Sequence, residues 1–384
     1  MTIQLTWPKI LAWRLRRQFV SDADGSDAVA IARRLCGVQT QVASSAQLAV
    51  AVRSARPDPG EIGRALWEER TLVKTWIMRG TLHLLPADEL ADYCAALATL
   101  RTWEKGSWQR GHGVTAAEIA AIIEAVPEAL RTSRAASPAL TPDASPSPAL
   151  TREELVEAVV EVTGEEHLRA ALTSGWGALL KPLARLGELC YGPPRDGRVT
   201  FTAPRSWLPG RPPELPPYEE AGVRLARAFL GAHGPATPEM FDTWLFGGVA
   251  RKAVLKGWFR DLAPELTEVE TDDGHTLLAL TEQLDELAAT EPSDDVHLLP
   301  GFDQYILAAP RTLTPLLAAA AKPKVSRQAG WISPVIVHRG RVAGVWEAKN
   351  GRITTDLFES VPEKPLDDAI SRVRSLLATT SLGD

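Results

Sequence analysis

The sequence has few cysteines, and they lie far apart. Its 384 residues contain three, Cys36, Cys94 and Cys190. No Cys-x-x-Cys pair or Cys/His cluster has the spacing of a zinc or iron–sulfur site, which excludes the common structural metal centres. An odd number of distant thiols also gives no disulfide framework. We expect three buried, reduced thiols in a cytoplasmic protein, with no metal and no cofactor.

Long apolar runs are also missing. The first twenty residues are rich in apolar side chains, but Lys9, Arg14, Arg16 and Arg17 interrupt them. No stretch approaches the roughly 18 consecutive apolar residues that a membrane-spanning helix requires. We therefore expect neither a signal peptide nor a contact with a membrane.

Positive charge is scarce overall but unevenly distributed. The formal net charge is −6, which is unusual for a protein that binds nucleic acid. Residues 1–110 nevertheless carry 15 Lys or Arg against 11 Asp or Glu, and residues 301–352 carry 8 against 2. Either this is chance variation, the simpler explanation for the first segment, or it gives an acidic protein one positive face.

Three breaks divide the chain. Residues 133–150 are rich in Ala, Ser and Pro, prolines crowd residues 209–220, and residues 289–303 lead into the basic segment. Such compositions favour linkers over packed structure. The expected regions are 1–130, a linker at 131–150, then 151–208, 218–285 and 290–384.

Between the breaks, a pattern of helices followed by a hairpin recurs. In 151–208, Thr151 and Glu154 form a capping box, a helix is either kinked at Pro182 or begins there, and a turn at Asp196-Gly197 joins two strands. In 218–285, Thr237 caps a helix, a basic helix covers 250–262, and a turn at 273–274 makes an acidic wing. The first 90 residues fit a looser copy, with helices near 7–19, 26–36, 45–54 and 60–69. We predict an α+β protein with three tandem winged-helix units. Such units serve as DNA readers, protein-interaction modules or scaffold.

The C-terminal region has a different pattern. Apolar residues alternate on both sides of a turn in the segment 334–346, which predicts a β-hairpin with His338, Arg339, Gly340 and Arg341 at its tip. A second turn at Asn350-Gly351 continues the sheet. A basic tip suits insertion into a DNA minor groove, but an ordinary solvated turn has the same pattern.

Gln39 and Gln41 lie in the segment "LCGVQTQVASS", which contains no carboxylate and no histidine. Gly37 is typical of the residue just after a helix, and Ser44 and Gln47 predict a capping box that begins the next helix. Residues 38–43 therefore connect two helices. On an extended backbone, residues two apart project to the same side.

Two amides on one side offer donors and acceptors that can hold a water molecule, but neither is a general base. Such a pair suffices only where the reaction needs little activation. Hydrolysis of the N-glycosidic bond of an N7-alkylated guanine is one case, because the base leaves from a cationic state. By itself, a Gln-x-Gln triplet is more often a surface or capping feature.

Four strings, spread over nearly the whole chain, resemble the AlkZ/YcaQ family of bacterial DNA glycosylases. They are "GVQTQ" (37–41), "TWIMRGTLHLLP" (75–86), "LLPGFDQYILAAPR" (298–311) and "PVIVHRGRVAGVW" (334–346). The family's catalytic motif is Gln-x-Gln in one branch and Gln-x-Asp in the other, and Gln39 and Gln41 match the first. The resemblance implies a C-shaped molecule with a positively lined channel. It also implies excision of bulky N7-alkylguanine adducts or interstrand crosslinks, often as self-resistance in producers of azinomycin B-like natural products.

The resemblance extends to further residues. Arg79 and His83 either contact phosphates beside the lesion or serve as an ion-pair partner and a buried strand residue. Asp303 either orients the sugar cation or caps a turn, and we favour the structural role. No lysine is marked as a Schiff-base nucleophile, so no AP-lyase activity is expected. The expected partner is double-stranded DNA carrying alkylated purines, bound by a monomer.

Two non-enzymatic alternatives remain. A winged-helix transcriptional regulator requires a dimer interface and base-specific contacts, and no heptad pattern or long dimerisation helix is visible. An inert lesion binder would shield adducts without excising them. Base flipping is optional for the enzyme, because a crosslinked base does not easily enter a snug pocket.

Overall fold

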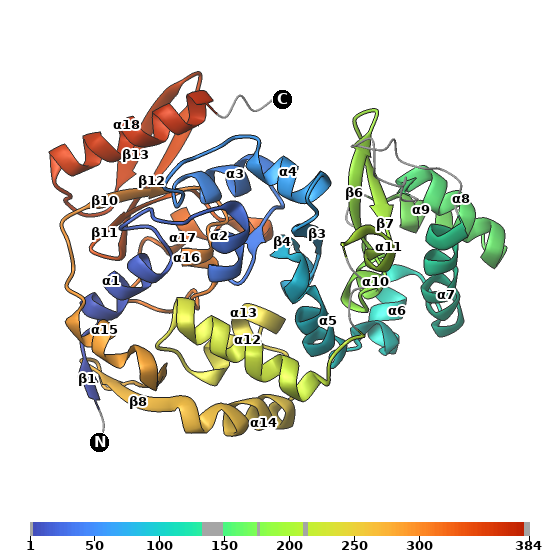
Figure 1. Cartoon of the computed structure of the whole chain (residues 1–384), viewed down its shortest axis with the longest axis horizontal. Coiled ribbons are helices and arrows are strands. Elements are labelled where there is room, and N and C mark those ends of the chain that lie inside the picture. The colour runs from blue at the N-terminus through green and yellow to red at the C-terminus, as the bar shows by residue number, and fades with distance from the viewer. Residues whose placement is uncertain (1–2, 133–148, 175–176, 210–213, 380–384) are drawn as a thin grey trace. The chain divides into compact units, whose positions relative to one another are not determined.

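The computed structural model describes residues 3–132, 149–174, 177–209 and 214–379. The chain forms two compact units. The first, here called the terminal unit, combines Met1–Ile62 with Val223–Asp384, and the second, the middle unit, is Gly63–Gly222. The chain passes between them within α4 (Glu61–Trp67) and α12 (Tyr218–His233), both labelled in Figure 1.

Nine further helices belong to the terminal unit in the part of the chain that the structure describes. They are α1 (Trp7–Arg17), α2 (Ala28–Arg34), α3 (Ala43–Ala51), α13 (Pro238–Phe246), α14 (Lys252–Leu262), α15 (Leu284–Ala289), α16 (Gln304–Leu307), α17 (Lys322–Val325) and α18 (Glu363–Thr379). One continuous apolar core joins residues from both ends of the sequence. Ile10, Leu48 and Val335 are among its members, each at most 5% exposed.

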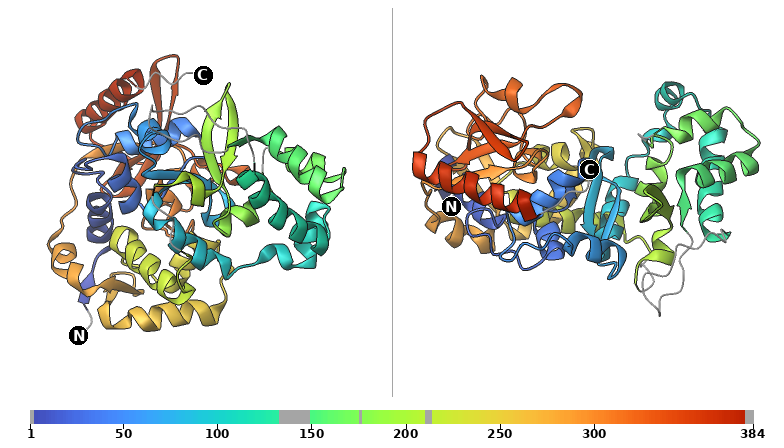
Figure 2. Two further views of the ribbon diagram at one scale, coloured as in Figure 1. Left: turned by 45° about the vertical axis from the view of Figure 1, so that its right-hand side comes forward. Right: turned by 90° about the horizontal axis from the view of Figure 1, so that it is seen from above.

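A four-stranded antiparallel sheet lies in this unit, with its strands in sequence order. It contains β10 (Val296–Leu299), β11 (Val335–His338), β12 (Arg341–Lys349) and β13 (Arg352–Leu357). Helix α18 packs along β10 and β13, as both views in Figures 1 and 2 show. The alternation in the C-terminal region therefore formed the expected hairpin at 339–340 and the second turn at 350–351.

A second sheet of the terminal unit joins distant parts of the sequence. Strand β1 (Ile3–Leu5) pairs parallel with β8 (Leu266–Thr271), which pairs antiparallel with β9 (Thr276–Leu280). Strands β8 and β9 form the expected acidic hairpin, with its turn at 273–274. Thr237 caps α13, and α14 is the expected basic helix.

The middle unit contains two groups of strands. Strands β3 (Leu72–Trp76) and β4 (Leu82–Pro86) pair antiparallel, and β5 (Leu150–Thr151), β7 (Arg198–Thr202) and β6 (Cys190–Arg195) form a sheet in that order. The larger helices are α5 (Leu90–Ala98), α6 (Gly106–His112), α7 (Ala116–Thr132), α8 (Arg152–Thr163), α9 (Leu168–Thr173) and α10 (Lys181–Arg185). The capping box of Thr151 and Glu154 is present at the start of α8, as expected.

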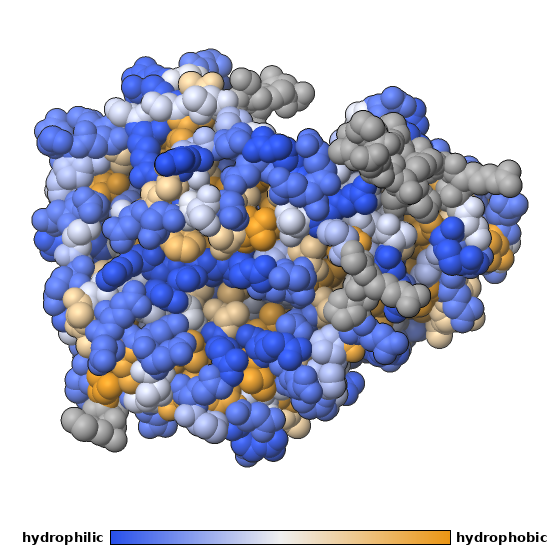
Figure 3. Space-filling model, viewed as in Figure 1, coloured by the Kyte–Doolittle hydropathy of each residue, from blue (hydrophilic) through white to orange (hydrophobic). Residues whose placement is uncertain are grey.

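The three winged-helix units, the domain boundaries and the C-shaped channel stay predictions, whereas the mixed helix and sheet content agrees with the expected α+β class. The stretch 133–150 lies outside the described residues except for Ala149 and Leu150, which are both buried. All three cysteines are buried free thiols. Within the described residues, no helix has the length and apolar character needed to cross a bilayer. Figure 3 shows hydrophobic residues in small patches among hydrophilic ones on the visible face.

Candidate active site

The two glutamines lie in a short connection between α2 and α3, as expected. Helix α2 ends in a tight reversal, in which Cys36 has φ 55° and Gly37 has φ 100°. The amide of Gly37 donates to the carbonyl of Ala32 at 2.8 Å, which closes the helix end. The short strand β2 (Val38–Gln39) follows, and Gln41 comes two residues before α3 begins.

The expected start of α3 is wrong. The helix begins at Ala43 and not after Ser44, its N-cap is Val42, and no side chain caps it. Ser44 therefore already has helical backbone and lacks the extended conformation that a capping serine needs. The helix therefore begins two residues earlier than the capping box implied.

The two glutamines differ in exposure. Gln39 is 6% exposed, whereas Gln41 is on the surface. Within the described residues, neither side-chain amide has a hydrogen-bond partner, so the donors and acceptors of both can bind water or substrate. Gln39 thus places an amide at the edge of the interior, and Gln41 places one in solvent.

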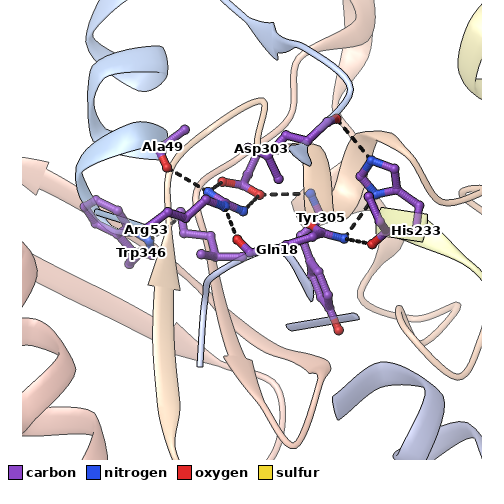
Figure 4. A network of polar contacts seen from close by, with 10 residues as sticks. Gln18, Ala49, Arg53, His233, Asp303, Tyr305 and Trp346 are labelled. Carbon is purple, nitrogen blue, oxygen red and sulfur yellow. Dashed lines mark hydrogen bonds and ion pairs between the residues drawn. The ribbon is translucent and has the colours of Figure 1, made fainter. Parts of the chain in front are cut away.

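A buried histidine, His233, which is labelled in Figure 4, contacts the start of this connection. Nε2 of His233 lies 3.1 Å from the carbonyl oxygen of Leu35, the C-cap of α2, and Nδ1 lies 3.0 Å from the amide nitrogen of Gln18. The Gln18 nitrogen also donates to the carbonyl of Ala232. Because that nitrogen is a donor, Nδ1 of His233 accepts and Nε2–H donates to Leu35. Burial lowers the pKa of His233 to about 3, so its ring is neutral at physiological pH.

An ion pair with no exposed surface continues this network. Arg53, just after α3, donates from Nη1 and Nη2 to the two carboxylate oxygens of Asp303 at 2.7 Å each. The guanidinium also donates to the backbone carbonyls of Gln18 and Ala49. Gln18 therefore links the two groups, since its side chain contacts His233 and its carbonyl accepts from Arg53 (Figure 4). We call these four residues, Gln18, Arg53, His233 and Asp303, the buried network.

Asp303 is in the interior, where it accepts from the backbone amide of Tyr305 and caps α16. Since it is 1% exposed, the structure supports the structural role over contact with a sugar cation. Gln18, Arg53 and His233 were not candidates from the sequence. No local pattern marks them, because the contacts of the network join segments up to 250 residues apart.

The tip of the basic hairpin packs against helix α1. Arg339 and Gly340 have φ of 49° and 77° and form the turn. A Cβ at Gly340 would lie 2.4 Å from Cβ of Leu11, and the hydroxyl of Tyr305 donates to the Gly340 carbonyl at 2.6 Å. The turn is therefore fixed on the body of the terminal unit.

The cationic side chains at the hairpin tip already have hydrogen-bond and ion-pair partners within the protein. Arg339 is 59% exposed and donates to Asp294 at 2.7 Å, and Arg341 donates to the carbonyl of Pro315. His338 is 12% exposed and lies 3.6 Å from the same Asp294 carboxylate. Arg339 is thus the tip residue best placed to reach DNA, and the DNA contacts of His338, Arg339 and Arg341 stay predictions.

A cleft of about 450 Å³ lies beside this tip. Arg16 and Arg339 contribute positive charge to its lining, and Asp22, Glu291 and Asp295 contribute negative charge. The mixed charge does not favour a phosphate in this cleft.

Arg79 and His83 belong to the middle unit. Arg79 has φ 53° in the turn between β3 and β4. His83, on β4, has no exposed surface, and its Nδ1 lies 3.0 Å from the carbonyl of Thr81. Burial, with a smaller effect of Arg79, lowers the pKa of His83 to about 3. This favours the buried strand role for His83. The contacts of both residues with phosphates stay predictions.

One group of possible metal ligands occurs among the described residues. Glu118, Glu165 and His167 bring one ligand atom each within 4.8 Å of one another. Glu165 and His167 are exposed, and Glu118 also accepts from the backbone amide of Thr115. These local contacts account for the arrangement without an ion.

The Gln-x-Gln connection of this α+β protein is thus supported by buried contacts. Comparison with known proteins shows that the class of protein is the DNA glycosylases. The model of the AlkZ-like DNA glycosylase family matches residues 32–379, and the chain belongs to this family.

Two comparisons with proteins of Streptomyces sahachiroi give the extent of the similarity. The chain is 40% identical, over 378 residues, to an interstrand DNA cross-link repair glycosylase, covering 97% of this chain and 96% of the relative. A solved structure of the DNA glycosylase AlkZ superposes with a TM-score of 0.88 at 39% identity, covering 97% of each chain.

Proposed function

We propose that the protein is a monofunctional DNA glycosylase that hydrolyses the N-glycosidic bond of N7-alkylated guanines. The observation that carries the proposal is the Gln39–Gln41 pair in a connection that the buried network holds in place, in a chain of the AlkZ-like family. In this proposal, Gln39 and Gln41 bind the attacking water, and Arg339 is the main DNA contact of the hairpin.

The chemistry explains why two amides suffice. Alkylation at N7 makes the guanine cationic, so the base leaves without being protonated first. The enzyme then has to hold water close to the sugar carbon and to stabilise the developing sugar cation with carbonyl dipoles. An amide side chain supplies both a hydrogen-bond acceptor for the water and such a dipole.

The proposed substrates are bulky adducts and interstrand crosslinks in double-stranded DNA. The relative from Streptomyces sahachiroi is an interstrand DNA cross-link repair glycosylase, which supports this substrate class. We infer a role in self-resistance to a DNA-alkylating natural product of the azinomycin B type, carried out by a monomer in the cytoplasm. The winged-helix units and the DNA channel belong to the same proposal.

The decisive experiment measures release of 7-methylguanine from a duplex under single-turnover conditions. Gln39→Ala and Gln41→Ala should each slow release roughly 100-fold or more, because each removes one contact to the positioned water. Gln4→Ala is the matched control, since Gln4 is an exposed glutamine on β1. Equal rates for all four proteins would remove the glutamines from the mechanism.

The same assay tests the absence of lyase activity. A monofunctional glycosylase leaves an intact abasic strand, and borohydride should trap no covalent complex between protein and DNA. Strand cleavage without added base, together with a trapped complex, would contradict this part of the proposal. The alternative of an inert lesion binder predicts binding with no base release by any variant.

A further inference from the structure

An exposed tryptophan lies in a short loop of the terminal unit. Residues 326–332 form this loop, here called the Trp331 loop, which a bridge between Ser326 and Ile332 closes. The amide of Arg327 donates to the carbonyl of Trp331 at 2.8 Å. Trp331 is 46% exposed, whereas most tryptophans bury their large apolar surface.

The backbone conformation of the loop is costly. Ala329 has φ 56° and Gly330 has φ 76°. An alanine in the left-handed region is strained, and such strain often marks binding and switch regions. The turn at Ala329 and Gly330 reverses the chain direction just before Trp331. The strained conformation is therefore part of the geometry that exposes the indole ring.

The indole ring packs against Phe302, a residue outside the loop. Its centroid lies 5.0 Å from that of Phe302 in an edge-to-face arrangement. Gly301, which precedes Phe302, is tightly enclosed. A Cβ there would lie 2.9 Å from the carbonyl oxygen of Ile332 and 3.6 Å from Oγ of Ser45. Ser45 is in the first turn of α3, four residues after Gln41. A continuous set of contacts thus joins Trp331 to the start of α3, all within the terminal unit.

The segment that leads to Trp331 is positively charged. Lys322, Lys324 and Arg327 precede Trp331, all three are exposed, and residues 322–331 contain no acidic side chain. Lys324 pairs with Asp356. Within the described residues, Lys322 and Arg327 have no ion-pair partner, so their charges remain available for phosphates.

We propose that Trp331 stacks on a nucleobase of the damaged DNA beside the alkylated nucleotide, while Arg327 and Lys322 contact the neighbouring phosphates. An exposed aromatic ring in a segment that also supplies cations is a common arrangement for binding an unstacked base. Stacking on Trp331 holds the DNA strand next to the lesion, so that the alkylated nucleotide stays close to Gln39 and Gln41. The inference rests on the proposed function, because it assumes that the same site holds damaged DNA.

The test uses the full chain and a short duplex with 2-aminopurine next to 7-methylguanine. Binding of the wild type should change the 2-aminopurine fluorescence, since that signal depends on stacking. Trp331→Ala should lose the change and bind roughly 10-fold more weakly, and Trp331→Phe should recover much of both. Val249→Ala is the control, because Val249 is an apolar residue of the same unit that is 57% exposed.

The phosphate contacts have a separate test. Arg327→Ala should reduce the salt dependence of binding by about one unit of log–log slope and leave the fluorescence change in place. Thermal unfolding of each variant confirms folding, which an exposed substitution should not disturb. The inference is overturned if Trp331→Ala matches the wild type in both fluorescence and affinity. Absence of base release by the wild type would instead refute the proposed function, and the fluorescence comparison would still decide whether Trp331 stacks.

Discussion

Arg53 and Asp303 form a bidentate ion pair with no exposed side-chain surface, although 250 residues separate them in the sequence. The pair joins the end of α3 to the turn before α16, and the carbonyl of Gln18 accepts a third bond from the same guanidinium. Because every partner is internal, the pair is part of the frame that fixes α3, the helix that Gln41 precedes.

Removal of one partner should therefore be costly. Arg53→Met leaves the Asp303 carboxylate buried without its counter-charge, and we expect a loss of about 3–5 kcal/mol in the free energy of unfolding. Adding Asp303→Leu should recover part of this loss, because two apolar residues leave no buried charge. Urea denaturation monitored by circular dichroism measures both.

The control for this pair is an exposed one. Lys364 and Asp368 form an ion pair on α18, with side chains 86% and 66% exposed. Lys364→Met should leave the free energy of unfolding nearly unchanged. If Arg53→Met proved as harmless as Lys364→Met, the buried pair would not stabilise the frame around α3.

His233 offers a test of positioning. His233→Leu removes the donor to the carbonyl of Leu35 and the acceptor for Gln18, so the start of the glutamine connection loses its support. We expect base release to slow roughly 10-fold, since a small misplacement of a catalytic group is costly. His233→Gln should restore much of the rate, because its amide can donate to the same carbonyl. A purely structural role would lower stability in His233→Leu without changing the rate of the folded protein.

The low pKa values of two histidines predict a loss of stability in acid. His233 and His83 each have a pKa of about 3, below the ordinary 6.5, because burial disfavours their charged forms. Below pH 6.5 the unfolded chain binds protons that the folded chain does not. The contribution of each histidine to the free energy of unfolding is therefore fully present above pH 6.5. It decreases toward pH 3 by about 1.4 kcal/mol per pH unit for each histidine. Denaturation of the wild type and His233→Gln at pH 7.5, 6 and 5, as sampling points near this window, should give a shallower decline for the variant. Parallel curves would contradict the assignment to His233.

Local features of the fold could be predicted from the sequence. The capping box of Thr151 and Glu154 starts α8, and the glycine at 340 ends β11 in a two-residue turn. These features depend on neighbouring residues, so a single segment contains the whole signal. The position of Gln39 and Gln41 between two helices was predictable for the same reason, from Gly37.

Contacts between distant segments could not be predicted. Strand β1 pairs with β8, where Ile3 faces Val269, and nothing in the segment 3–5 indicates its partner. The buried network is equally hidden, since a single arginine or histidine in a helical segment usually lies on the surface. The false capping box at Ser44 shows the limit of local signals, because packing moved the helix start to Ala43.

The ion pair at the hairpin tip predicts opposite effects for its two members. Asp294 is exposed, and the Arg339 guanidinium beside it lowers the pKa of that carboxyl. Asp294→Asn should free Arg339 for phosphate and tighten binding to duplex DNA, whereas Arg339→Ala should weaken binding and lower the salt slope by about one. Fluorescence anisotropy at several salt concentrations measures both. Asp368→Asn is the control, because it breaks an ion pair on α18. An unchanged slope in Arg339→Ala would exclude a phosphate contact by this residue.

Alanine variants of two glycines in neighbouring turns distinguish the effect of backbone strain on stability from the effect of packing. Gly340 and Gly351 both have positive φ, 77° and 71°, so alanine is strained at either position. A Cβ at Gly351 meets nothing within 4 Å, whereas one at Gly340 would lie 2.4 Å from Cβ of Leu11. Gly351→Ala should therefore cost about 1 kcal/mol, and Gly340→Ala should cost more, since it pushes the hairpin tip off α1 and weakens the bond from Tyr305. Leu11→Gly added to Gly340→Ala should relieve part of the clash, because it removes the Leu11 Cβ, and give a favourable coupling in a double-mutant cycle. Equal losses for the two glycine variants would show that the tip is not packed on α1 in solution, and the hairpin would then be free to enter a DNA groove as the sequence first suggested.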